Sequence, residues 1–162
     1  MPALQRTGKE IAEIYNRQVD TVYRICYSFM KNTHDTEDMV QETFLRLMSS
    51  GVVFRSDEHE KAWLIVTASN LCKDTLKKWW RKTEDISDPS LGLHQPPFEV
   101  DCVLEAILRL PKDQKTVVYM YYYEGYSTAD IACYLGCQHA TVRSRLSRAR
   151  KTLKSKLGGD FC

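Results

Sequence analysis

The chain has 162 residues, a length that allows one ordinary domain or two small ones. With 43% hydrophobic and 27% charged residues it has enough apolar side chains for a core, and it lacks the run of about 18 apolar residues that a membrane-spanning helix needs. The N-terminal sequence has no apolar stretch followed by a small-residue cleavage site, so we expect a cytoplasmic protein without membrane insertion.

The six cysteines are an even number, which in a small secreted chain would indicate disulfides. Most of them lie inside apolar helical patterns such as ICYSF and IACYLGC, and this favours reduced, buried thiols. Cys133 and Cys137 are four residues apart, but no second pair of ligands accompanies them. We therefore predict no metal site.

Apolar residues recur at helical spacing along the chain and strand-like alternation is nearly absent, so the sequence predicts an all-α protein. The first long helix is marked by apolar side chains three and four residues apart: Ile11, Ile14, Tyr15, Val19, Val22, Cys26 and Phe29.

A second helix is predicted to begin near Thr36, where Asp35 can cap it and Asp38 follows three residues later. It stops at Gly51. Its predicted core residues are Val40, Phe44 and Leu47.

The pair Asp57 and Glu60 gives the capping signature of a third helix, which is expected to end near Lys82. The apolar stripe of this helix, with Trp79 assigned to the core, consists of Ala62, Ile65, Val66, Cys72, Leu76 and Trp79.

Residues 83–101 contain five acidic residues and no Lys or Arg, have several prolines and show no periodicity. They are predicted to form a flexible acidic linker. The chain is thus expected to consist of a helical domain at 1–82, the linker, and a second small helical domain at 102–162.

In the second domain, Pro111 suits the first turn of a helix that ends by Gly125. Ser127 with Asp130 predicts the start of a short helix, and Gly136 lies in the turn that follows it. A basic helix comes next. Two short helices joined by a glycine-containing turn are typical of a helix-turn-helix, whose second helix enters the DNA major groove.

The basic helix has a core face and an outward face. Its seven cations within residues 138–157, without an acid, indicate a surface for a polyanion, although a solvated helical face is the alternative. The core face is Val142, Leu146, Ala149 and Leu153. The outward face is Ala140, Ser144, Ser147, Arg148 and Lys151, with Arg143 on one flank. Arg145 and Arg150 lie beside the core and are expected to clamp phosphate or to pair with an acid.

These residues resemble a known family. The segment TVRSRLSRARKTL and the residues before it resemble the fourth conserved region of extracytoplasmic-function sigma factors. The resemblance implies that this helix reads the promoter's minus-thirty-five element through Arg143, Ser144, Ser147 and Arg148. Gln138 and Ala140 depart from the family pattern, which usually has Ser and often Gly there.

The segment HDTEDMVQETFLRLM resembles the second region of the same family, which docks on core RNA polymerase. The resemblance implies that the first domain binds the polymerase through one helical face, whose residues are Asp38, Met39, Gln41, Glu42 and Arg46. A helix with an ordinary solvated acidic start is the alternative.

The predicted third helix has a second face that combines an aromatic ring, an amide and cations, which suits a single strand of nucleic acid. Its residues are Trp63, Thr67, Asn70, Asp74, Lys77 and Arg81. The segment KAWLIVTASNLCKDTLKKWWRK also resembles the family. The resemblance implies a pocket for an unpaired minus-ten base, formed by Asn70 and the loop from Phe54 to His59.

No grouping of residues in the sequence points to catalysis, and no phosphate loop or cofactor motif is found. We therefore expect a sigma factor that is not an enzyme, needs no cofactor and binds core RNA polymerase, promoter DNA and an anti-sigma factor. Two other readings stay open: a repressor or activator that acts without polymerase docking, and an adaptor that binds only proteins.

Overall fold

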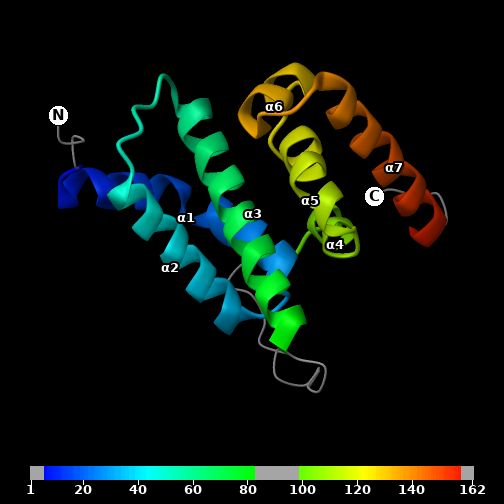
Figure 1. Cartoon of the computed structure of the whole chain (residues 1–162), viewed down its shortest axis with the longest axis horizontal. Helices are drawn as coiled ribbons and strands as arrows, with labels where there is room; N and C mark the ends of the chain where they lie inside the picture. The colour runs from blue at the N-terminus through cyan, green and yellow to red at the C-terminus, as the bar shows by residue number, and fades with distance from the viewer. Residues whose placement is uncertain (1–5, 83–98, 158–162) are drawn as a thin grey trace. The chain divides into compact units, whose positions relative to one another are not determined.

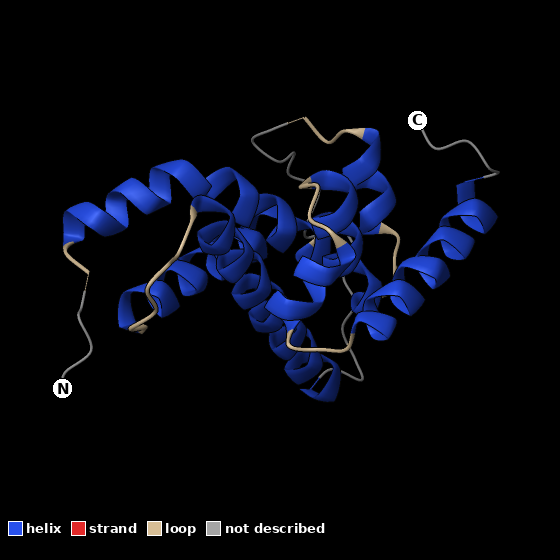
Figure 2. Cartoon of the chain, turned by 90° about the horizontal axis from the view of Figure 1, so that it is seen from above, coloured by secondary structure: helices blue, strands red, loops and turns tan. Residues whose placement is uncertain are grey.

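In the computed structural model, residues 6–82 and 99–157 are described, and every regular element within these ranges is a helix (Figure 2). The all-α prediction is confirmed. The chain divides into two compact units, Met1–Gln95 and Pro96–Cys162. Most of the predicted linker, residues 83–98, lies outside the described residues.

The first unit is built from three long helices, α1 (Gly8–Met30), α2 (Thr33–Ser49) and α3 (Asp57–Lys82), which all contact one another (Figure 1). Its core contains fully buried side chains from each helix, including Ile25, Leu47 and Ile65. The three amphipathic helices thus form one bundle in which each shields the apolar faces of the other two.

Two helix starts differ from the predictions. Helix α2 begins at Thr33, three residues before the predicted start, because the Asn32 side chain accepts a hydrogen bond from the Asp35 backbone N–H at 2.8 Å. Lys31 has a φ of 65° at the end of α1, which lets Asn32 follow at once. Helix α3 begins at Asp57. The Ser56 hydroxyl accepts a hydrogen bond from the His59 N–H, so Ser56 caps the helix in place of Asp57.

Two further predictions for the first unit need correction. Trp79 is 41% exposed and is not a core residue. Val66 and Leu76 are only half-buried, whereas Leu64 and Ala68 are fully buried. Because α3 packs against both α1 and α2, its buried face is broader than the predicted stripe. This buried face also lies nearer the start of the helix than the predicted stripe does.

The cysteines follow the prediction in part. Cys26 and Cys72 are fully buried in the first unit with free thiols, and burial, together with the hydrogen bond between the Cys26 thiol and Cys72, raises the pKa of the Cys26 thiol well above its usual value. In the second unit Cys133 is exposed and free, while Cys102 is exposed and disulfide-bonded. For Cys133 the expected burial is wrong although its thiol is free as expected, and for Cys102 both the burial and the reduced thiol are wrong.

The second unit consists of α4 (Cys102–Leu108), α5 (Lys112–Val118), the π-helical turn η1 (Tyr119–Tyr123), α6 (Thr128–Leu135) and α7 (His139–Leu157). Helix α7 packs on α5 and α6, and η1 contacts α4, α5 and α6 (Figure 1). The predicted continuous helix to Gly125 is therefore interrupted, since its last turn before Gly125 is wider than an α-helical turn.

Candidate nucleic-acid interface

The helix-turn-helix of the second unit forms as its sequence predicts. The Ser127 hydroxyl accepts from the Asp130 N–H at 3.1 Å and caps α6. Gly136 ends α6 with a φ of 65°, the left-handed conformation that glycine adopts at low cost. Because the chain changes direction within this one turn, α7 packs beside α6.

The outward face of α7 carries the predicted duplex-reading residues. Val142, Leu146, Ala149 and Leu153 are buried at the core side. The exposed residues opposite them are Arg143, Ser144, Ser147, Arg148 and Lys151. Arg148 Nη2 donates to Ser144 Oγ at 3.4 Å, so these two side chains lie together on the helix surface. Arginine and serine arranged in this way can bond base edges and phosphates in a major groove.

Arg150 has a different partner from the one expected. Its Nε donates to Tyr122 Oη at 2.6 Å, and its guanidinium lies 5.9 Å from the ring centre of Tyr121. The hydrogen bond that Arg150 donates to Tyr122 raises the pKa of Arg150 above its usual value. Arg150 thus fastens α7 to η1 through two tyrosines, and it pairs with no acid among residues 6–82 and 99–157. The sequence signal for this contact was the aromatic run YMYYY.

The single-strand candidates lie in one row on α3. Trp63 and Thr67 are half-buried, while the others in the row are exposed: Asn70, Asp74, Lys77 and Arg81. The spacing of three and four residues along one straight helix brings them onto a common face.

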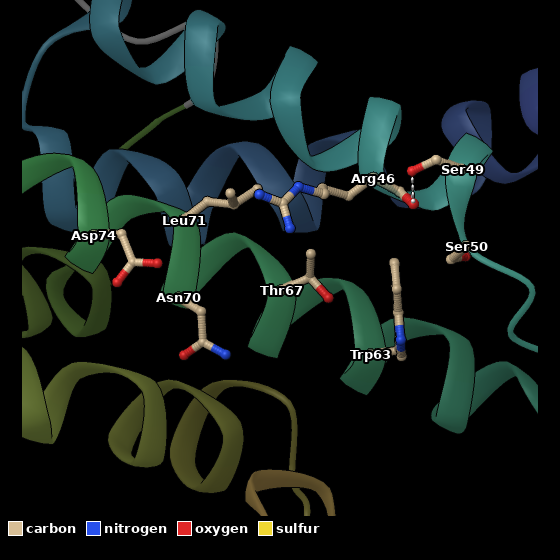
Figure 3. Close-up of a pocket in the computed structure, with 8 residues that line it drawn as sticks. All are labelled: Arg46, Ser49, Ser50, Trp63, Thr67, Asn70, Leu71 and Asp74. Carbon is tan, nitrogen blue, oxygen red and sulfur yellow. Dashed lines mark hydrogen bonds between the residues drawn. The ribbon is translucent and has the colours of Figure 1, made fainter.

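This row borders a pocket with a volume of about 400 Å³ (Figure 3). Its lining residues are Arg46, Ser49, Ser50, Trp63, Thr67, Asn70, Leu71 and Asp74. Trp63 lies near one end of the pocket, Asn70 and Asp74 lie near the other, and Arg46 comes from α2 on the facing side (Figure 3). The pocket therefore offers a ring for stacking, amide and hydroxyl groups for hydrogen bonds, and a cation for phosphate.

The loop from Phe54 to His59 does not line this pocket. Phe54 instead packs edge-on against Trp63, with 5.8 Å between ring centres, and against His59 at 5.4 Å. Arg6 donates to the Val52 carbonyl and lies over the Phe54 ring. The loop thus supports the pocket indirectly, because Phe54 packs against Trp63, which lines it. Sequence reasoning missed Ser49 and Ser50, which reach the pocket only because α2 ends there.

The exposed face of α2 holds four of the five predicted docking residues: Asp38, Gln41, Glu42 and Arg46. Met39 is the exception because its side chain is buried, with the Thr75 hydroxyl 3.5 Å from its sulfur. The apolar part of the exposed face is supplied by Leu45 and Met48, which are 47% and 48% exposed. A helical wheel places both on the side of Asp38, so this signal was present in the sequence.

At the start of α2, His34, Asp35 and Asp38 have ligand-type atoms within 4.8 Å of one another. His34 and Asp38 are exposed, and their nearest side-chain N and O atoms are 3.9 Å apart. Such a group is common at a solvated helix start and we assign no metal to it.

Within residues 6–82 and 99–157, no helix is long and apolar enough to span a membrane.

Comparison with known proteins matches both units to one family. The model for sigma-70 region 2 matches residues 14–82, and the model for sigma-70 region 4 matches residues 100–153.

Individual relatives cover most of the chain. It is 29% identical over 151 residues to the ECF RNA polymerase sigma factor EcfG of Rhodopseudomonas palustris (strain TIE-1), covering 88% of this chain and 82% of that protein. It is 30% identical over 156 residues to the ECF RNA polymerase sigma factor SigM of Bacillus subtilis (strain 168), covering 90% of this chain and 93% of SigM.

A solved structure shares the fold: the sigma factor RpoE in complex with the anti-sigma factor NepR from Bartonella quintana. It is 23% identical, has a TM-score of 0.73, and the match covers 94% of this chain and 99% of that one. From the two matched regions and these relatives, the chain belongs to the extracytoplasmic-function sigma factors of the sigma-70 family, and it directs promoter-specific initiation of transcription by RNA polymerase.

Proposed function

We propose that the two units divide the work of promoter recognition between them. The first unit docks on core polymerase and holds the opened minus-ten strand, and the second reads the minus-thirty-five duplex. The observation that carries this proposal is that the units present different kinds of surface. One has a pocket with an indole, an amide and a cation, and the other has an exposed helix of arginines and serines.

The pocket on α3 suits a base that has left the stack. Unpairing and unstacking a base costs a few kcal/mol, so the base is captured only where new contacts offset this cost. Trp63 would stack on the base and Asn70 would bond its edge, while Lys77 and Arg81 would follow the phosphates along the same row.

The second unit would place α7 in the major groove. Arg143 and Arg148 would read base edges, Ser144 and Ser147 would reach a base or a phosphate, and Lys151 would anchor the backbone. The Ser127 cap and the Gly136 turn support this role because they fix the direction in which α7 leaves α6.

Docking on core polymerase would use the exposed face of α2. Leu45 and Met48 form an exposed apolar centre, and Asp38, Gln41, Glu42 and Arg46 surround it with polar and charged groups. An apolar centre with a polar rim is the usual composition of a protein-binding surface. Met39 would support this face from inside the bundle.

Partners and location follow from the same assignment. We expect the protein to act in the cytoplasm as a regulatory DNA-binding subunit without catalysis or a cofactor of its own, with 1–82 and 102–162 as working domains and 83–101 as their tether. The solved relative RpoE is in complex with an anti-sigma factor, NepR, and this supports an anti-sigma partner for the present chain too.

Reconstituted transcription tests the proposal. The purified chain is mixed with core polymerase and a library of promoter fragments, and transcripts are mapped. We expect specific initiation from a subset of fragments that share two elements. A chain that binds the fragments but starts no transcript would be a repressor or activator, and a chain that binds polymerase but no DNA would be a protein-only adaptor. Either result would overturn the proposal.

A further inference from the structure

The last two turns of α3 expose two neighbouring tryptophans that the pocket does not use. Trp80 is 83% exposed and Trp79 is 41% exposed. Leaving an indole in water forgoes the stabilisation of burying one of the largest apolar side chains. Nothing in the fold of the first unit requires Trp80, since its ring is almost entirely outside the bundle.

The charged residues next to Trp80 in the sequence of α3 are positive. The segment from Thr75 to Lys82 reads TLKKWWRK and contains no acid. Lys77, Lys78 and Arg81 are exposed within it. Asp74 lies one turn before Lys77, but three exposed cations follow it on α3, so the end of the helix has a net positive charge. It therefore attracts an anionic partner, and an exposed ring beside cations is the combination that binds nucleic-acid strands.

The same helix connects Trp80 with the pocket. Trp63 and Trp80 are 17 positions apart, which is about 25 Å along α3 at 1.5 Å per residue. Viewed down the axis of α3, Trp80 lies about a quarter turn from the row of Trp63 and Asn70. The angular position of Lys77 is between that row and Trp80. A strand that left the pocket along Lys77 would therefore meet the ring of Trp80.

We propose that Trp80, with Lys77 and Arg81, is a second stacking site for single-stranded DNA, several nucleotides from the base held at Trp63 and Asn70. The inference rests on the proposed function of α3 and extends it. Charge complementarity selects the occupant, because a protein partner with an apolar surface would have to cover Lys77 and Arg81 without compensation.

Fluorescence provides the first test. The W63F/W79F variant leaves Trp80 as the only one of the chain's three tryptophans. Titrating the full-length variant with oligodeoxythymidylate should quench its emission in a saturable way, and the quenching should weaken several-fold as salt is raised. A blunt duplex of equal length should quench at least tenfold less effectively at equal concentration.

Other occupants would give different signals in the same titration. Quenching by the duplex that equals quenching by the single strand would overturn the single-strand assignment. If raising salt alone changed the emission before DNA was added, the ring would already be covered by an acidic part of the chain itself, and the proposal would fail.

The second test uses the holoenzyme on a template with a pre-opened bubble. Trp80→Ala should weaken binding about fivefold or more, as expected for losing one base–aromatic stack. Trp80→Phe should retain most of the affinity because it keeps an aromatic ring. Trp80→Leu is the matched control: it keeps apolar bulk without a ring face, so affinity equal to that of the unmodified chain would indicate a protein contact and contradict the proposal.

The two proposals fail in distinguishable ways. If the unmodified chain gives no specific initiation with core polymerase, the proposed function itself is wrong. If initiation is specific and Asn70→Ala alters it, but Trp80→Ala changes neither bubble binding nor quenching, only the second stacking site is wrong.

Discussion

The side chain of Glu60 shows how a single residue joins two helices of the first unit. Its carboxylate is 7% exposed and accepts hydrogen bonds from Arg17 Nη2 at 3.0 Å and from Gln18 Nε2 at 3.0 Å. These bonds fasten the start of α3 to α1, and the one between Arg17 and Glu60 raises the pKa of Arg17 above its usual value. The sequence marked Glu60 only as part of a helix start.

Replacing Glu60 should therefore destabilise the first unit. We expect Glu60→Ala to lower the free energy of unfolding by about 2–3 kcal/mol, because charged hydrogen bonds are lost and Gln18 is left buried without this acceptor. Urea denaturation followed by circular dichroism measures the change.

Glu105→Ala is the matched control for this experiment. It removes an exposed pair in which Glu105 and Arg109 are 3.1 Å apart, and it should cost less than about 1 kcal/mol. Equal losses for both variants would contradict the role assigned to the buried carboxylate.

Met39 and Leu45 show that the chemical type of a residue does not by itself decide whether its side chain is buried. Both are apolar residues of α2, yet Met39 is buried and Leu45 is 47% exposed. The difference comes from their angular position around the helix relative to α1 and α3, which pack on one side only. Trp79 was misplaced for a different reason: it lies on the buried side of α3 with Cys72, but so close to the end of the helix that the bundle no longer covers it.

At the scale of elements, the caps decide where each helix begins, and the turns decide its direction relative to the preceding helix. The Ser127 cap and the Gly136 turn were readable because these residue types are specific for such positions. The π-helical turn at Tyr119–Tyr123 was not, because the tyrosines are compatible with an α-helix and the wider turn is stabilised by contacts with other elements.

Gly136→Ala should disturb the helix-turn-helix. A Cβ at this position meets no atom within 4 Å, so the cost comes from the φ of 65° alone. We expect a loss of about 1–2 kcal/mol in the stability of the second unit and weaker binding to promoter duplex. Thermal unfolding and a duplex-binding titration measure the two effects.

Gly8→Ala serves as the control at a glycine whose added Cβ also meets open space but whose φ is not positive. It should leave stability unchanged or slightly raised, because alanine is favoured over glycine in a helix. A larger loss at Gly8 than at Gly136 would contradict the conformational explanation.

On the scale of the whole molecule, the two proposed DNA surfaces lie on two units with separate cores. Their contributions should therefore be separable by mutation. We expect Arg148→Ala to weaken binding to promoter duplex by about 1–3 kcal/mol and to relax sequence preference, with little effect on a pre-opened bubble.

Asn70→Ala should show the reverse pattern, with duplex binding kept and bubble binding reduced. Comparing both variants on duplex and bubble templates measures the separation. Unchanged affinity and unchanged sequence preference for Arg148→Ala would remove that residue from the duplex-reading surface.

The sequence by itself determined the helical class, the helix-turn-helix and the buried side of α7, because each depends on periodicity or on a residue type with a strong local preference. It also brought Trp63 and Asn70 into one row, since a single helix fixes their spacing. Only the tertiary structure decided that Arg46, Ser49 and Ser50 close the pocket against that row, that Arg150 bonds Tyr122, and that Met39 is buried. These contacts join residues on different helices, and their formation depends on how the helices pack, which local preferences do not specify.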